Sequence, residues 1–227
     1  MAWTGLTDQN LHNEIQYTLL ETPNSGASYG SGLYTATEVQ ATLNLRFAEF
    51  AKRTGYLSKR STAVSTTANT QTVSMPSDLI DLVRVGYPNS SGTITSIPRG
   101  SLVEAQAFIT DLIGSDSAVD VPYMCSLDSN TQDYMKLSFY PWPNASRTLD
   151  FLYIALPTAL PTTPNGTALN LPKDLCPFIK YGALADLFSK TGEAYDPARA
   201  QLCSQLFELG IQITQSFISG SAPLVKE

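Results

Sequence analysis

The chain has 227 residues, a net charge of −6 and a pI of about 4.8. This length allows one large domain or two small ones, with a core that needs no disulfides. A surface that wraps nucleic acid needs clustered Lys and Arg, so the acidic balance argues against that class. The low charged fraction of 15% indicates instead that partners cover much of the surface.

The cysteines are odd in number and far apart, at Cys125, Cys176 and Cys203. No CxxC or Cys/His spacing is present, which argues against a zinc site and favours buried thiols in a reducing compartment. The first residues lack the basic and apolar regions of a secretory signal. No run of about 18 apolar residues occurs, so we expect no membrane-spanning helix.

Two helices are predicted in the N-terminal part. The first spans residues 7–20, where apolar residues recur every four positions. A Gly/Ser-rich loop at residues 22–32 follows. Thr35 and Glu38 form a capping box that begins the second helix, and Gly55 is suited to end it.

Residues 61–160 lose the helical period and read as a β-rich unit. A capping box at Ser101 and Glu104 predicts one helix within it, ending at Gly114. Strands or extended segments are expected near residues 61–74, 82–87, 93–97, 123–127, 134–140 and 148–156. The last two strands flank a Pro-Trp-Pro turn and predict a hairpin.

The C-terminal part is helical again from Leu171. Asp196 and Pro197 supply an N-cap and a first helical residue for a last helix that runs to about Ser219. Residues 209–225 contain no charge, whereas a helix exposed to water normally has a charged face. Packing against another subunit is the preferred interpretation, and burial in its own domain is the alternative.

Together these patterns predict an α+β fold. Residues 1–60 and 161–227 are expected to form a bundle of about four helices with a C-terminal docking segment, the usual arrangement of apolar-striped helices. Residues 61–160 are expected to form an inserted antiparallel β-rich unit.

No set of residues suggests catalysis. Residues 26–30 match GxSxG, but that motif needs a strand before Ser28 and a downstream histidine, whereas the one histidine, His12, lies upstream. Asp111, Asp116 and Asp120 lack the alternating ligands of a calcium loop. We therefore predict no catalytic, cofactor-binding or metal-binding residues, and a protein that is not an enzyme.

Five basic residues cluster in the sequence, with Glu49 as the one acid among them: Arg46, Lys52, Arg53, Lys59 and Arg60. They form either a solvated helix face or a contact with an acidic partner or with DNA. Trp142 is either a packing plug under the predicted hairpin or an interface anchor.

The order of short motifs carries a resemblance. The segments are Leu33-Tyr-Thr-Ala-Thr-Glu-Val39, Arg53-Thr-Gly55, Met75-Pro-Ser-Asp-Leu79, Phe139-Tyr-Pro-Trp-Pro143 and Leu171-Pro-Lys-Asp174. Over residues 33–205 the chain resembles the head-to-tail adaptor (connector) proteins of tailed bacteriophages. The large β-rich unit departs from the small adaptors, which are almost entirely helical.

The resemblance implies a structural protein of the virion, made in the bacterial host cytoplasm. Such adaptors form a closed ring of about twelve copies between the portal and the tail or a second connector ring. DNA passes through the channel without sequence-specific binding. The C-terminal segment reaches the portal, and the residues expected to dock there are Ile211, Ile213, Phe217, Ile218, Leu224 and Val225. The five basic residues and Trp142 are candidate contacts to partners or to the DNA channel.

A β-rich module of a fibre or surface protein that binds a ligand or glycan is the alternative function. Such a module would place aromatic side chains on one exposed face. The candidates are Tyr134, Tyr140, Trp142 and Tyr153.

Overall fold

The computed structural model describes residues 6–19, 33–101, 103–104, 118–128, 135–161 and 163–220. It divides into two units. The helical unit comprises Met1–Tyr56 and Pro157–Glu227, and the β unit comprises Leu57–Leu156. The described residues form four α-helices and two antiparallel sheets, so the fold class is α+β.

The first two helices begin at the predicted caps. Helix α1 spans Asp8–Thr18, and the Thr7 hydroxyl accepts a hydrogen bond from the backbone of its first turn. Helix α2 spans Ala36–Thr54 and is capped in the same way by Thr35. Gly55 ends α2 with a φ of 65°, a left-handed conformation that favours glycine.

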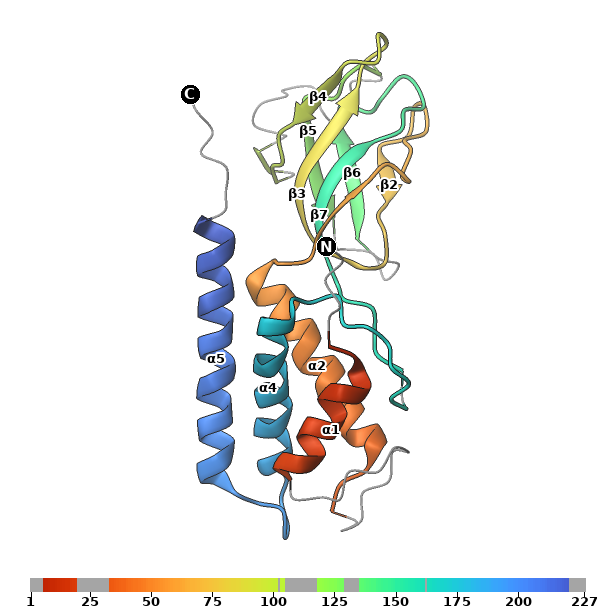
Figure 1. Cartoon of the computed structure of the whole chain (residues 1–227). Coiled ribbons are helices and arrows are strands. Elements are labelled where there is room, and N and C mark those ends of the chain that lie inside the picture. The colour runs from red at the N-terminus through yellow and green to blue at the C-terminus, as the bar shows by residue number, and fades with distance from the viewer. Residues whose placement is uncertain are drawn as a thin grey trace. The chain divides into compact units, whose positions relative to one another are not determined.

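Helix α4 is the centre of the helical unit. It spans Cys176–Phe188, after a short 3₁₀ turn at Lys173–Leu175, and packs against α1, α2 and α5. Helix α5 spans Pro197–Gly220. Contact with helices on several sides explains why α4 is apolar around most of its circumference. Figure 1 shows these helices side by side, with α5 running opposite to α4.

Buried and half-buried polar side chains join the two chain segments of the helical unit. The Asp8 carboxylate is fully buried and accepts hydrogen bonds from the backbone N–H groups of Gly166 at 2.8 Å and Asn165 at 3.2 Å. The Asn44 amide donates to the Leu160 carbonyl at 3.0 Å and accepts from the Leu160 N–H at 2.7 Å. Because these groups are paired, their burial is tolerated.

Seven strands form the two sheets of the β unit. Their bounds are Ser58–Ser61 (β1), Thr72–Ser74 (β2), Leu79–Pro88 (β3), Ile94–Ile97 (β4), Met124–Asp128 (β5), Lys136–Tyr140 (β6) and Asp150–Ala155 (β7). One sheet has the order β1-β7-β3-β4 and the other β2-β6-β5, and all pairs are antiparallel.

The two sheets share one hydrophobic core. Tyr87 of β3 and Phe139 of β6 meet edge to face, with ring centroids 5.8 Å apart, and Phe151 of β7 is buried in the same cluster. Strand β7 alternates half-buried and buried residues, as expected for a strand with one face on a core.

The predicted hairpin at residues 137–154 is wrong. Strand β6 belongs to the three-stranded sheet and β7 to the four-stranded one, so the proline-rich segment between them carries the chain from one sheet to the other. Two adjacent apolar runs can pair with each other or can cover one core from two sheets, and the second arrangement occurs here. Trp142 is therefore not a plug under a hairpin. It is half-buried, and its carbonyl accepts a hydrogen bond from the Val119 N–H at 3.0 Å.

The chain enters the β unit before the predicted residue 61. Strand β1 pairs with β7, with Arg60 opposite Leu152, so Lys59 and Arg60 belong to the β unit. The capping box at Ser101 is present: the Ser101 N–H donates to the Glu104 carboxylate at 2.6 Å, and the Glu104 N–H donates to the Ser101 hydroxyl at 3.1 Å. The rest of that predicted helix and the loop at residues 22–32 lie outside the described residues.

Candidate assembly surface

Helix α5 begins at the predicted cap and packs one face on its own unit. The Asp196 carboxylate accepts a hydrogen bond from the Arg199 N–H at 3.1 Å, and Pro197 occupies the first helical position. The buried face of the helix consists of Ala200, Cys203, Phe207, Gly210, Ile211 and Thr214.

Two glycines allow close contact around α5. A Cβ atom on Gly210 would lie 2.2 Å from Cγ of Phe178, so the Phe178 ring packs directly over the backbone of α5. A Cβ atom on Gly182 of α4 would lie 2.8 Å from Cδ2 of Phe207. Contacts this short leave no room for a side chain, and α4 and α5 therefore pack closely at these positions.

Ion pairs attach α2 to α4 and α5. The Arg46 guanidinium forms a bidentate pair with Asp186, including an Nε–Oδ2 distance of 2.7 Å, and stacks over the Phe207 ring. Arg53 pairs with Glu208 of α5 at 2.6 Å. Bidentate geometry gives such pairs directional specificity as well as charge attraction.

The end of α5 is exposed beyond Thr214, the last buried residue of the helix. The side-chain amide of Gln215 donates to the Arg53 carbonyl at 2.7 Å, close to the end of α2. Every residue from Gln215 to Gly220 is exposed, and Phe217 is 68% exposed. In Figure 1 this end of α5 extends beyond the ends of α2 and α4. We call residues 215–220 the projecting end.

The residues predicted to dock on a portal are divided by the structure. Ile211 is 2% exposed and belongs to the core of the helical unit. Ile213 is half-buried, and Phe217 and Ile218 are exposed at 68% and 37%. Leu224 and Val225 lie outside the described residues. The uncharged run thus contributes to its own core as far as Thr214 and is exposed beyond it.

The predicted basic cluster is divided between the two units. Arg46, Lys52 and Arg53 lie on α2, whereas Lys59 and Arg60 lie on β1. Lys59 pairs with Asp78 at 2.7 Å, and Arg60 pairs with Asp150 at 2.6 Å. Arg46 and Arg53 have carboxylate partners as described above. Lys52 is exposed and forms no ion pair with the residues that the structure describes.

The β-unit pairs also shift the ionisation of their carboxylates. Burial disfavours the charged form of Asp78, but hydrogen bonds from Lys59 and the Tyr153 hydroxyl outweigh it and lower the pKa of Asp78. The Arg60 guanidinium lowers the pKa of Asp150. Lys59 and Arg60 therefore have carboxylate partners within the β unit.

The three cysteines and His12 are buried. Burial raises the pKa of Cys125 and of Cys176 to about 11 and also raises that of Cys203, so the thiols stay protonated. Burial lowers the pKa of His12, which is 1% exposed. Within the described ranges, no three His, Cys, Asp or Glu side chains are grouped as a metal site requires. The GxSxG segment, Asp111 and Asp116 lie outside those ranges.

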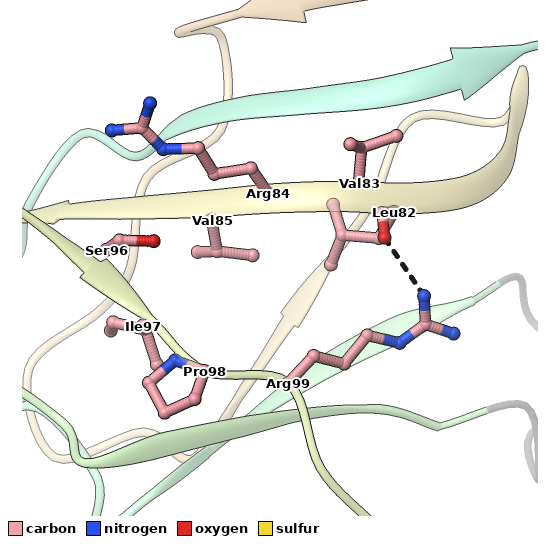
Figure 2. Close-up of a pocket in the computed structure, with 8 residues that line it drawn as sticks. All are labelled: Leu82, Val83, Arg84, Val85, Ser96, Ile97, Pro98 and Arg99. Carbon is pink, nitrogen blue, oxygen red and sulfur yellow. Dashed lines mark hydrogen bonds between the residues drawn. The ribbon is translucent and has the colours of Figure 1, made fainter. Parts of the chain in front are cut away.

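A pocket of about 220 Å³ lies between β3 and β4 of the β unit. Figure 2 shows Arg99 extending toward the backbone of β3, where it donates to the Leu82 carbonyl at 2.9 Å. Arg99 also pairs with Asp81 at 2.6 Å. The eight residues that line the pocket include one hydroxyl, Ser96, and no histidine, cysteine or carboxylate. This lining offers no general base to activate a nucleophile.

The described candidates for the aromatic face of a glycan-binding module do not form an exposed platform. Tyr140 is 6% exposed and Tyr153 is 5% exposed, and both point into the unit rather than to solvent. Tyr134 lies outside the described residues, and Trp142 is half-buried. Tyr140 and Tyr153 are part of the buried interior. The pattern of residues along a strand does not show whether its aromatic side chains face the core or the solvent.

Sequence reasoning missed several exposed apolar residues on the helices. Leu45 of α2 is 62% exposed, and Leu202 and Leu209 of α5 are 56% and 47% exposed. Leu202 and Leu209 lie seven residues apart, about two helical turns, so the sequence already placed them on one face of the last helix. A helix with two apolar faces needs a second partner.

Comparison with known proteins adds an independent result. The family model described as SU10 adaptor protein matches residues 14–225, which cover most of the 227-residue chain. No curated protein matches the chain. Among the described residues, no helix is long and apolar enough to cross a bilayer. The chain belongs to the SU10 adaptor protein family, a family of structural head-tail adaptors of phages.

Proposed function

We propose that the protein is a head-to-tail adaptor that forms a ring joining the portal to the tail around the DNA channel. Membership of an adaptor family supports assembly with other head and tail proteins. The observation that carries the proposal is the projecting end of α5, in which every residue is exposed and uncharged. Phe217 would be removed from water only by a contact outside its own unit.

The projecting end is the part of the chain that docks on the portal. Phe217 and Ile218 supply its apolar contact area. Leu224 and Val225 continue the contact from outside the described residues. Aromatic side chains are enriched among the residues that dominate protein interfaces, so Phe217 is the expected anchor.

The ring contains about twelve copies, and its closure lets every interface support its neighbours. DNA passes through the channel without sequence-specific binding, and the net charge of −6 suits a lumen that repels it. Four of the five basic residues already pair with carboxylates of this chain: Arg46, Arg53, Lys59 and Arg60. Each would have to break its ion pair before it could bind a new partner. Lys52 and Trp142 are therefore the preferred candidates for contacts with a neighbouring protein or with DNA.

The change Phe217→Glu tests the docking role. It places a charge in the proposed apolar contact, so co-assembly with portal rings should fall by at least about tenfold. Gln212→Glu is the matched control, because it adds the same charge at an exposed position of α5 before the projecting end. Binding is measured by co-sedimentation and by the mass of the particle. Equal binding by Phe217→Glu and wild type would refute portal docking through this segment.

A further inference from the structure

Helix α5 has a second apolar face beside its buried one. Leu202, Leu206, Leu209 and Ile213 are spaced three or four residues apart and form one row along the helix. Leu202 is 56% exposed, Leu209 is 47% exposed, and the other two are half-buried. We call these four residues the α5 row. It precedes the projecting end and is separate from it.

Helix α2 has an outward row of complementary size. Thr37, Ala41, Leu45 and Ala48 are also spaced three or four residues apart, on the side opposite the buried Leu43. Leu45 is 62% exposed, and Ala41 and Thr37 are exposed as well. We call these residues the α2 row. Like the α5 row, it contains no charged residue.

From these two rows we infer that the α5 row of one copy packs against the α2 row of a second copy of this chain. This inference rests on the proposed function, since it assigns the contact that builds the ring. Each row runs for about 16 Å at 1.5 Å per residue. The α5 row supplies large side chains and the α2 row supplies small ones around Leu45, as knobs and holes require when two helices pack.

The two rows lie on different helices, and this decides the kind of assembly. A contact between two different surfaces is heterologous, so each copy keeps a free α2 row after its α5 row is occupied. Repetition of such a contact closes into a ring when the rotation per copy allows it. Helices α2 and α5 run in the same direction in Figure 1. A rotation about an axis parallel to the helices keeps that direction, so the α5 row of one copy and the α2 row of the next would run parallel.

A second copy explains the rows better than burial of either row within the chain. Each row keeps exposed residues in the folded helical unit: Leu202 and Leu209 on α5, and Thr37, Ala41 and Leu45 on α2. Neither row contains a charged residue, whereas a helix face exposed to water normally does. Adaptor families assemble into oligomers, and one chain provides both halves of this contact.

Cysteine cross-linking tests which helices meet. Full-length Leu45→Cys and Leu209→Cys proteins are made separately, mixed, assembled and oxidised. If the rows touch, a disulfide forms between one chain of each variant, because this bond requires Cβ atoms roughly 4 Å apart. The double variant should yield a ladder of linked oligomers. The three natural cysteines are buried and contribute little background.

Gln201→Cys is the matched control, because Gln201 is exposed on α5 but lies outside the α5 row. It should not cross-link to Leu45→Cys. A second measurement uses Leu209→Glu, which changes an exposed residue and should leave the unfolding temperature unchanged. Self-assembly should weaken by at least about tenfold, whereas Gln201→Glu should assemble as wild type does.

The outcomes separate this inference from the proposed function. Normal assembly of Leu209→Glu, or equal cross-linking by Gln201→Cys, would overturn the row contact and leave the adaptor role intact. If Leu209→Glu self-assembled normally but no longer bound the portal, the inference would also be overturned, because the α5 row would then contact the portal and not a second copy. A wild-type chain that stays monomeric in the presence of the portal would overturn both.

Discussion

The two units of the protein are built from the chain in different ways. The β unit is one continuous segment, and its two ends meet where the Ala155 N–H donates to the Leu57 carbonyl at 2.9 Å. The helical unit combines residues from both ends of the chain. Its internal polar contacts join Asp8 to Gly166 and Asn44 to Leu160, residues more than 100 positions apart.

The two units therefore differ in how far each depends on the rest of the chain. The β unit has its core, its sheets and its ion pairs within residues 57–156, so it needs no other part of the chain to complete it. The helical unit needs both chain ends before its core closes, and it carries the apolar α5 row and the projecting end. The contacts proposed for portal docking and for ring closure therefore lie on the unit that depends on long-range contacts.

Removal of the β unit is the strongest test of this comparison. Residues 57–156 are replaced by a short Gly/Ser linker from Tyr56 to Pro157, which is feasible because the ends of the β unit lie together. The remaining helical unit should keep its helical circular dichroism and unfold in a cooperative transition. The isolated segment 57–156 should fold separately. Loss of cooperative unfolding in either piece would mean that the units stabilise each other.

The change Gly210→Ala tests the close packing of the helical unit. The new Cβ atom would lie 2.2 Å from Cγ of Phe178, so α4 and α5 must move apart. We expect a loss of about 1–3 kcal/mol in the free energy of unfolding of the helical unit. Denaturant titration of the two units measures it, and the β unit should be unaffected.

Gly220→Ala is the control for helix propensity. A Cβ atom at Gly220 would meet no atom within 4 Å, so stability should change by less than about 0.5 kcal/mol. If Gly210→Ala were as stable as Gly220→Ala, the close contact over Phe178 would not limit packing.

The two units should respond to acid over different pH ranges. Burial of His12 lowers its pKa, although the nearby Asp8 carboxylate and a hydrogen bond with the Ala36 backbone oppose the shift. The unfolded state therefore binds a proton at His12 first as pH falls below about 6.5. Stability of the helical unit should be present above that pH and decrease as pH falls toward the lowered folded pKa.

The β unit contains no histidine and should keep its stability through that range. Its paired carboxylates, Asp78 and Asp150, have lowered pKa values, so their contribution is lost only as pH falls below about 4. Thermal melts of each unit at successive pH values measure both effects. His12→Gln should remove the decrease near neutral pH, and persistence of that decrease would assign it to other groups.

Local patterns were sufficient to predict most of the elements that the structure describes. Thr35, Gly55 and Asp196 lie at helix ends for reasons of backbone hydrogen bonding that involve only neighbouring residues. Strands were located from β-branched and aromatic runs, although β1 and β6 begin at different residues from those expected. Such signals depend on the chain within a few residues and are readable without a structure.

Partners in three dimensions could not be predicted in the same way. The apolar runs of β6 and β7 are adjacent in sequence, yet they join different sheets because each covers the shared core from its own side. The basic residues formed one cluster in sequence, but the fold divides them between two units and pairs Arg46 with Asp186, 140 positions away.

The sequence by itself determined the α+β class, the ends of the described helices and an uncharged C-terminal helix. Only the tertiary structure decided that Ile211 is core while Phe217 is exposed, because this depends on where α2 and α4 end beside α5. Periodicity shows that a helix has an apolar face, but the side chains packed against that face decide how much of it remains for a partner.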